Sequence, residues 1–356
     1  MMNHTTAHAV RHILLIKFRH HGDMLLTTPV INTLSQTYPD AEIDVLLYLE
    51  TQDMLVANPR IHRIFAIDRQ WKKQGLRTQL SKEWQLISQL RHQRYDLVIN
   101  LADQWRSALI AKLTGAPVRL GFDFEKRQHP LWRYCHSDLV STEQHGQQHT
   151  VEQNLSILSP LGIPSVSTQV TMGYTAEDWA QCQKKLRQQQ VDGPYIVVQP
   201  TSRWLFKCWS EEKMAAAISA LRQDGHTIVV TSGPDVKEQK MVSDILAYCP
   251  THGVVSLSGQ LTLRQLAALI DHARLFLGVD SVPMHMAAAL QTPSIALFGP
   301  SKLHFWRPWQ APGEVIWAGD YGTLPDPDDI DTGTQQRYLD LIPVEAVTAA
   351  VRRQLS

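Results

Sequence analysis

Short apolar runs and longer amphipathic segments alternate along this chain from residue 12 onward. The apolar runs are rich in Val, Ile and Leu and have the length of strands, whereas the segments between them repeat apolar residues at helical spacing. In the first half this pattern predicts strands at 12–18, 42–48, 62–68, 95–101 and 117–122, and helices at 24–38, 78–94, 104–114 and 150–161. Strands that alternate with helices in this way predict parallel sheets with crossover helices.

The alternation is interrupted and then begins again. A polar, turn-rich stretch at 123–150 precedes the last of these helices, and the segment LGIPSVSTQV at 161–170 is typical of a linker. After the linker we expect helices at 176–190, 210–223, 235–248, 262–271 and 284–290, and strands at 195–200, 226–232, 254–259, 274–280 and 293–299. Two successive doubly wound halves are the simplest interpretation.

The length of 356 residues also favours two domains, because one hydrophobic core rarely serves more than roughly 250 to 300 residues. We expect an N-terminal domain at 1–170, a C-terminal domain at 171–340, and a last helix at 341–356 that packs back on the N-terminal domain. The predicted fold class is α/β, with two Rossmann-like domains facing across a cleft, the GT-B arrangement. Dehydrogenases and sugar epimerases show similar patterns, so this fold alone leaves the chemistry open.

Composition and charge exclude several classes of protein. The 34 Lys and Arg residues balance 34 Asp and Glu residues, which gives no bulk attraction to nucleic acid. Residues 1–170 carry 18 basic and 15 acidic side chains, a net +3, which leaves 16 and 19, a net −3, for the rest. The four cysteines form no C-x-x-C pair, and the first apolar run, at 13–16, is far shorter than the ~20 residues of a membrane span. We therefore expect a cytoplasmic protein without a zinc site or disulfides.

The motifs of dinucleotide and ATP binding are missing, since no G-x-G-x-x-G follows the first strand and no G-x-x-x-x-G-K-[ST] occurs anywhere. The first strand is followed instead by FRHHG and Asp23. A carboxylate in a strand-to-helix turn lies where open α/β proteins bind ligands. The alternative is that Asp23 only caps the helix at its positive end.

Three segments of the second half offer groups for an anionic ligand. In GVDSVPMH, Asp280 and Ser281 end an expected strand and a helix follows at once, so its amides could hold a pyrophosphate. Ser281 could equally be an ordinary N-cap, and His285 an ordinary residue of the first turn.

The other two segments follow two further strands. After YIVVQ, Thr201 and Ser202 offer hydroxyl and amide donors, and Lys207 is a compact cation suited to a diphosphate, although it could also be a solvated surface residue. In TSGPDVKEQ, Gly233 lies in a turn and Glu238 behind it could accept hydrogen bonds from ribose hydroxyls. Acidic first turns are also common for reasons of the helix dipole.

Taken in order, these segments resemble the ADP-heptose:lipopolysaccharide heptosyltransferases, glycosyltransferase family 9, over almost the whole chain. The matching pieces are the early GD with its TxP helix, SALIAKLTGAPVRLGF, the loop TSRWLFKCW, LFLGVDSVPMH with its AAAL helix, and ALFGPS followed by FWRPW. The WLFKCW loop and Val282 are similar to the group that adds the third heptose. Val282 is also a departure, because the family usually has Gly there, and Gly permits closer backbone approach.

The resemblance implies an inverting transfer of L-glycero-D-manno-heptose from ADP-heptose to a heptose of the lipopolysaccharide inner core. Inversion needs a base opposite the leaving group, and by position in the family motif that base is Asp23. Lys207, Thr201 and the amides around Ser281 would stabilise the ADP leaving group, while Asp280 would engage sugar hydroxyls or order Lys207. No obligatory metal is expected, because Lys and helix amides can neutralise the diphosphate.

Two further expectations concern the acceptor and the start of the helix after Ser281. A lipid-anchored acceptor brings a cytoplasmic enzyme to the inner-membrane surface, with Arg19, His20 and Arg127 as candidate acceptor-binding residues or as ordinary solvated ones. Val282 should have a negative φ, with Ser281 capping the helix and the free amides of Met284 and His285 facing the phosphates. The alternatives are a heptosyltransferase that adds the first or second heptose, a UDP-sugar transferase, a sugar-nucleotide epimerase and a catalytically silent binding module.

Overall fold

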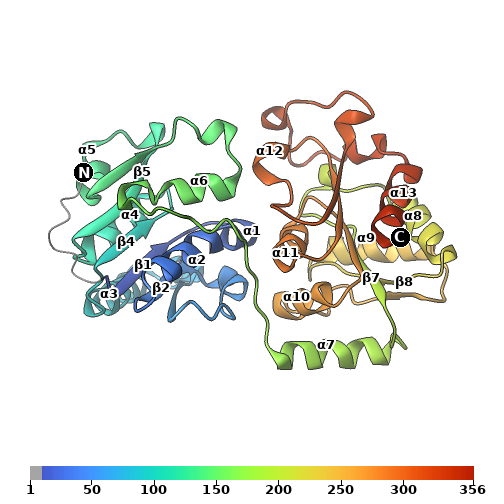
Figure 1. Cartoon of the computed structure of the whole chain (residues 1–356), viewed down its shortest axis with the longest axis horizontal. Coiled ribbons are helices and arrows are strands. Elements are labelled where there is room, and N and C mark those ends of the chain that lie inside the picture. The colour runs from blue at the N-terminus through green and yellow to red at the C-terminus, as the bar shows by residue number, and fades with distance from the viewer. Residues whose placement is uncertain (1–9) are drawn as a thin grey trace. The chain divides into compact units, whose positions relative to one another are not determined.

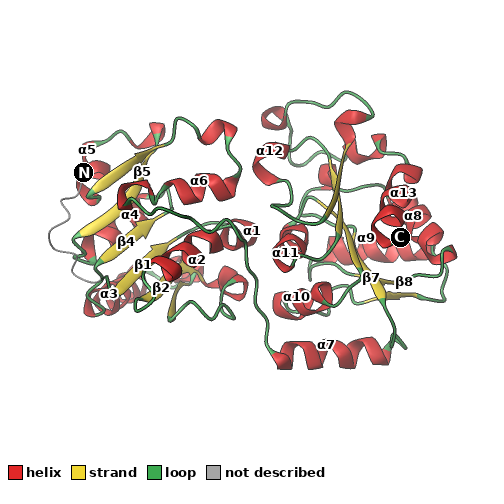
Figure 2. Cartoon of the chain, viewed as in Figure 1, coloured by secondary structure: helices red, strands yellow, loops and turns green. Residues whose placement is uncertain are grey.

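The structure, a computed structural model, describes residues 10–356 of the chain. It consists of two compact units, of which the first ends at Gly173 and the second spans Tyr174–Ser356. Each unit is a sheet of parallel strands with helices on its two faces (Figure 1, Figure 2). Within residues 10–356, no helix is long and apolar enough to cross a membrane.

The first unit contains a six-stranded parallel sheet in the order β3-β2-β1-β4-β5-β6. Its strands are β1 (His12–Ile16), β2 (Glu42–Tyr48), β3 (Arg63–Ile67), β4 (Leu97–Asn100), β5 (Val118–Asp123) and β6 (Asp138–Ser141). Its α-helices are α1 (His21–Leu25), α2 (Thr28–Thr37), α3 (Leu76–His92), α4 (Trp105–Leu113), α5 (Pro130–Cys135) and α6 (Thr150–Ser156). The strand order reverses between β1 and β4, so the loops after these two strands diverge and leave a place for a ligand.

The second unit repeats this plan with a sheet in the order β12-β11-β10-β7-β8-β9. Its strands are β7 (Tyr195–Gln199), β8 (Thr227–Val230), β9 (Val254–Ser256), β10 (Leu275–Val279), β11 (Ser294–Phe298) and β12 (Gly313–Trp317). Its α-helices are α7 (Ala176–Gln188), α8 (Glu211–Gln223), α9 (Val236–Ala247), α10 (Leu263–Asp271), α11 (Val282–Leu290), α12 (Leu303–Trp306) and α13 (Val344–Leu355). Here the order reverses between β7 and β10.

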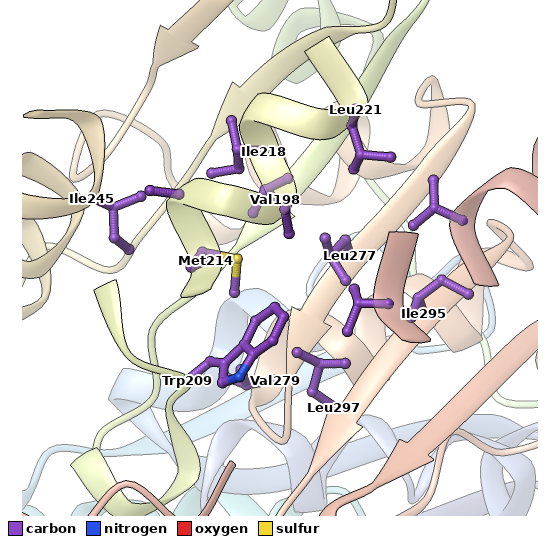
Figure 3. Packing of buried hydrophobic residues seen from close by; sticks show 14 of the residues in the cluster. Val198, Trp209, Met214, Ile218, Leu221, Ile245, Leu277, Val279, Ile295 and Leu297 are labelled. Atoms are coloured by element: carbon purple, nitrogen blue, oxygen red, sulfur yellow. The ribbon is translucent and has the colours of Figure 1, made fainter. Parts of the chain in front are cut away.

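The central strands of the second sheet form its core. Every residue of β7, β10 and β11 is buried, as expected for parallel strands covered by helices on both faces. Trp209 and Met214, at the start of α8, lie among Val198, Leu277 and Val279 (Figure 3). The loop that carries Lys207 is therefore anchored to the core two residues later, by a fully buried indole.

The helix expected at 24–38 is two helices, α1 and α2, separated at Leu26 and Thr27. Pro29 begins the second helix and has no N–H to continue the first. The Thr27 and Thr28 hydroxyls donate to the carbonyls of Met24 and Leu25, at 2.6 and 2.8 Å, and so satisfy the end of α1. A short polar sequence can thus end one helix and start another without any glycine.

Four elements were missed, because they are short, as is α12, or not strongly apolar. The stretch at 123–150 contains α5 and β6, and β12 follows the last expected strand. Both β6 and β12 are edge strands, and their residues are mostly half-buried or exposed. Edge strands lack the continuous apolar run by which central parallel strands are recognised.

The last helix, α13, packs on the second unit, against α8 and the strands β10, β11 and β12. The expectation that residues 341–356 return to the N-terminal domain is therefore wrong. Val347, Ala350 and Val351 are fully buried in the same cluster as Leu221 of α8. Residues spaced three and four apart form one apolar face of the helix, and that face is buried against the second sheet.

Trp209→Ala should lower the free energy of unfolding of the second unit by about 3–5 kcal/mol, because it removes a large, fully buried side chain and leaves a cavity. Trp84→Ala is the matched control, since Trp84 is 74% exposed and its removal should cost less than about 0.5 kcal/mol. Urea denaturation of the two variants beside the wild type measures both values. Equal losses would show that Trp209 does not support the core.

Candidate functional site

In the second unit, an ion pair occupies the point where the strand order reverses. Lys207 ends a 3₁₀ helix after β7 and donates from Nζ to Oδ2 of Asp280, after β10, at 2.6 Å. The Ser301 hydroxyl donates to the same oxygen at 2.6 Å, and the Ser202 hydroxyl donates to the Asp280 carbonyl at 3.3 Å. The sequence predicted Lys207, Ser202 and Asp280, and the structure brings these three together.

The pair is oriented and largely withdrawn from water. The Lys207 side chain is 16% exposed and that of Asp280 7% exposed, so the ammonium group retains an opening to solvent. An ammonium group has three N–H donors, and Asp280 takes one of them. The Trp204 ring, with its centroid 5.2 Å from Nζ, limits where the others can point. The arrangement can hold an anionic oxygen next to Lys207 at small cost in side-chain entropy.

A second hydrogen-bonded group links the ends of β7 and β8. The Gln199 side-chain amide donates to the Thr201 hydroxyl at 2.8 Å, and that hydroxyl donates to Oε2 of Glu238 at 2.6 Å. The Gly233 amide donates to the same oxygen at 3.1 Å. Thr201, Gly233 and Glu238 were all predicted, but the Thr201 proton is engaged by Glu238. Since both bonds fall on Oε2, Oε1 can accept from a ligand hydroxyl.

The start of α11 differs in part from the expectation. Ser281 occupies the N-cap position, but its hydroxyl donates back to the Val279 carbonyl at 3.1 Å and caps nothing. The Met284 amide donates to the Ser281 carbonyl at 3.2 Å, so it is not the free phosphate donor that was expected. The Met284 and His285 side chains are buried. The negative φ expected for Val282 is confirmed, because Val282 is not among the non-glycine residues with positive φ in residues 10–356.

In the first unit, Asp23 lies beyond β1 at the corresponding reversal of strand order. It is the third residue of α1, whose N-cap is His20, so Asp23 does not cap the helix. Its side chain is half-buried, and within residues 10–356 no donor hydrogen-bonds to its carboxylate. A partly desolvated carboxylate with open acceptor positions can accept a proton from a ligand.

Lys17 is a functional group that the sequence reasoning missed. It lies immediately after β1, is 7% exposed, and donates from Nζ to Asn154 Oδ1 at 3.2 Å and to the Leu101 carbonyl at 3.4 Å. Burial lowers the pKa of Lys17 to about 8, while the negative charge of Asp23 opposes that decrease. The available signal was a Lys between the apolar residues Ile16 and Phe18, where a surface side chain is unexpected.

Three cations gather around Asp103, after β4. Lys126 hydrogen-bonds to the carboxylate, Arg19 lies 3.4 Å from it, and Arg127 donates to the Asp103 carbonyl at 2.7 Å. Burial opposes ionisation of Asp103, but the Lys126 hydrogen bond and the two positive charges hold its pKa below the ordinary value. The structure therefore brings together the predicted Arg19 and Arg127. His20 is exposed and has no part in these contacts.

Metal ligands are not clustered in the part of the chain that the structure describes. Among residues 10–356 there is no group of three or more His, Cys, Asp or Glu side chains that could hold a metal ion. The four cysteines are free thiols, three of them buried.

The chain is similar to known glycosyltransferases in sequence and in structure. The family model of glycosyltransferase family 9 (heptosyltransferase) matches residues 83–333. Lipopolysaccharide heptosyltransferase 3 of Escherichia coli is 44% identical over 337 residues, which cover 95% of this chain and 97% of that protein.

Two solved structures share the fold over nearly the full length of both chains. A family 9 glycosyltransferase from Veillonella parvula superposes with a TM-score of 0.82 at 23% identity, covering 97% of each chain. The E. coli ADP-heptose lipopolysaccharide heptosyltransferase II gives 0.76 at 22% identity, covering 97% of this chain and 98% of that one. The predicted α/β fold with two Rossmann-like units of the GT-B class is confirmed. With the family match and the 44% identity, the chain belongs to glycosyltransferase family 9, the heptosyltransferases.

Proposed function

We propose that this enzyme transfers L-glycero-D-manno-heptose from ADP-heptose to a heptose of the lipopolysaccharide inner core, adding the third heptose with inversion. The observation that carries the proposal is the Lys207–Asp280 pair at the reversal of strand order in the second unit, in a chain 44% identical to a lipopolysaccharide heptosyltransferase 3. In this proposal Asp23 is the base, Lys207 the cation for the leaving diphosphate, and Glu238 the acceptor for ribose hydroxyls.

Lys207 is proposed to bind the diphosphate and to stabilise the charge that develops when the glycosidic bond to ADP breaks. Asp280 then orders Lys207 through its 2.6 Å hydrogen bond rather than acting as a base. Because a fixed ammonium group can offset much of the diphosphate charge, we propose that the transfer needs no divalent metal. Ser202, next to the Asp280 carbonyl, is a further donor at this position.

Glu238 is proposed to bind the ribose of ADP. Its Oε2 is fixed by Thr201 and Gly233, which leaves Oε1 facing a turn at the carboxyl end of the sheet. Acidic residues in this part of Rossmann-like domains accept hydrogen bonds from ribose hydroxyls. Thr201 thus contributes by holding Glu238, since its own proton is already donated.

Asp23 is proposed to remove the proton from the attacking acceptor hydroxyl, on the face of the sugar opposite the leaving group. Lys17 interacts electrostatically with Asp23, whose negative charge opposes the decrease in the pKa of Lys17 that burial causes. Arg19 and Arg127, with Lys126, form a cationic group suited to anionic substituents of the inner core. His20, which is exposed and follows Arg19 in the sequence, is a further candidate for acceptor binding.

The acceptor is lipid-anchored, so the enzyme is proposed to work at the cytoplasmic face of the inner membrane. The decisive assay offers ADP-heptose with lipopolysaccharide truncated at successive core sugars, in the presence of EDTA. One heptose should be added only to acceptors that already carry the second heptose, and ADP should compete with the donor better than UDP or GDP. Preference for a UDP-sugar, or no transfer to any core acceptor, would overturn the proposal.

Asp23→Asn should reduce kcat by about 100-fold to 10,000-fold, because it removes the proposed base. The affinity for ADP should stay nearly unchanged, because the proposed ADP-binding groups belong to the other unit. Single-turnover kinetics and calorimetric titration with ADP measure the two quantities. Asp40→Asn, an exposed carboxylate of the same unit, should change neither. Near-normal turnover of Asp23→Asn would exclude it as the base.

Lys207→Ala should weaken ADP binding by about 10-fold to 150-fold and also lower kcat, since a charge-assisted hydrogen bond to phosphate is lost. The matched control is Lys240→Ala, which removes another lysine paired with an aspartate at 2.6 Å but with its side chain 73% exposed. Calorimetry with ADP compares the two variants. Equal affinities would remove Lys207 from the donor site.

Lys17→Met should slow transfer most strongly below about pH 8. In the wild type Lys17 is positively charged below its pKa of about 8, whereas above that pH both proteins have a neutral side chain at this position. The ratio of the variant's kcat/KM to that of the wild type should be lowest below pH 8, and the two curves of kcat/KM against pH should converge above pH 8. Lys112→Met, in the same unit, should follow the wild type. A constant loss at every pH would indicate a purely structural role for Lys17.

A further inference from the structure

Helix α3 of the first unit exposes three large apolar side chains in a row. Leu76, Leu80 and Trp84 are 78%, 68% and 74% exposed and are spaced four residues apart, so they share one face of the helix. The same helix uses Leu86 and Leu90, on another face, to pack on the core. Single exposed apolar residues need no explanation, but an aligned stripe that ends in Trp is typical of an interaction surface.

The surroundings of this apolar stripe, Leu76, Leu80 and Trp84, are cationic. Arg77 is exposed on α3 next to Leu76, and Lys73 is exposed just before the helix. The one acidic residue of the helix, Glu83, is already paired with Arg106 of α4. The helix therefore presents an apolar stripe with uncompensated positive charge beside it, and no negative charge available to an approaching surface.

A basic hollow of about 810 Å³ lies at the carboxyl end of α3. It is lined by Arg63 of β3, by Arg91, His92 and Arg94, and by neutral residues, with no carboxylate among its lining groups. Among residues 10–356, no ion pair engages these three arginines. Arg91 is seven residues after Trp84, two helical turns along, and so continues the face that bears the stripe.

We infer that α3 is a docking surface for an anionic lipid bilayer, with Leu76, Leu80 and Trp84 in the interfacial region and the arginines of the basic hollow on lipid phosphates. This inference rests on the proposed function, because a lipid-anchored acceptor requires work at a membrane. Trp and Leu beside Lys and Arg are the composition by which interfacial helices bind anionic lipids.

Charge complementarity favours a bilayer over a second copy of the chain. A symmetric dimer through this face would place Arg77 and Arg91 of one copy near the same cations of the other, whereas an anionic surface attracts both of them. The stripe is also short, about 12 Å from Leu76 to Trp84 at 1.5 Å per residue. Three side chains on so short a stripe fall well short of the roughly 800 Å² per partner that stable protein interfaces bury.

The test uses the full chain and sedimentation with vesicles of phosphatidylethanolamine and phosphatidylglycerol, against vesicles of phosphatidylcholine alone. The wild type should bind the anionic vesicles at least about tenfold more tightly than the neutral ones. Leu80→Ser/Trp84→Ser should weaken binding to anionic vesicles by about tenfold or more, because two apolar side chains no longer leave water. The matched control Val236→Ser alters a side chain that is 80% exposed in the second unit and should bind as the wild type does.

The cations are tested separately with Arg91→Gln/Arg94→Gln, which should remove most of the preference for phosphatidylglycerol. Vesicle binding needs no heptose transfer, so its outcome is independent of the proposed reaction. With a deacylated, soluble acceptor, Leu80→Ser/Trp84→Ser should retain wild-type activity. The inference would be overturned by unchanged vesicle binding of that variant, by its loss of activity on the soluble acceptor, or by a wild-type dimer that the same substitutions dissociate.

Discussion

A charge withdrawn from water must be met by an opposite charge or by oriented dipoles, and this requirement shapes the functional ends of both sheets. In the second unit Lys207 is met by Asp280, and Asp280 in turn by Ser301. In the first, Lys17 is met mainly by neutral oxygens, and burial lowers its pKa to about 8. The two lysines thus differ in their partners, since Lys207 is paired with a carboxylate and Lys17 hydrogen-bonds to an amide oxygen and a carbonyl.

These charges lie where they do because of sheet topology. In each unit the strand order reverses beside the first strand, between β1 and β4 and between β7 and β10. Loops that leave a parallel sheet on opposite sides of such a point create a depression at its carboxyl edge. Asp280 and Lys17 each follow a buried, hydrogen-bonded strand directly, so the backbone of each residue is held in a fixed position.

The sequence predicted the central strands and most helices well, because a strand buried on both faces is a continuous apolar run. The edge strands β6 and β12 were not predicted, because their partly exposed residues form no continuous apolar run. The break between α1 and α2 was not predicted either, because it is stabilised by local hydrogen bonds from the Thr27 and Thr28 hydroxyls. In the site, Lys207, Asp280 and Glu238 were predicted from their places at strand ends. Three contacting residues were not predicted, because they lie 21, 23 and 137 residues from their partners in the sequence: Ser301 beside Asp280, Lys126 beside Asp103, and Asn154 beside Lys17.

The side-chain amide of Asn154 connects α6 to the turn after β1 in the first unit. Asn154 of α6 accepts from Lys17 through Oδ1 and donates through Nδ2 to the Leu26 carbonyl at 3.0 Å, so it clamps both ends of the turn that contains Asp23. Those partners lie 137 and 128 residues earlier in the chain. The turn therefore acquires its final shape only after nearly the whole unit has been synthesised and α6 has docked, so the surroundings of Asp23 are among the last parts of this unit to be completed.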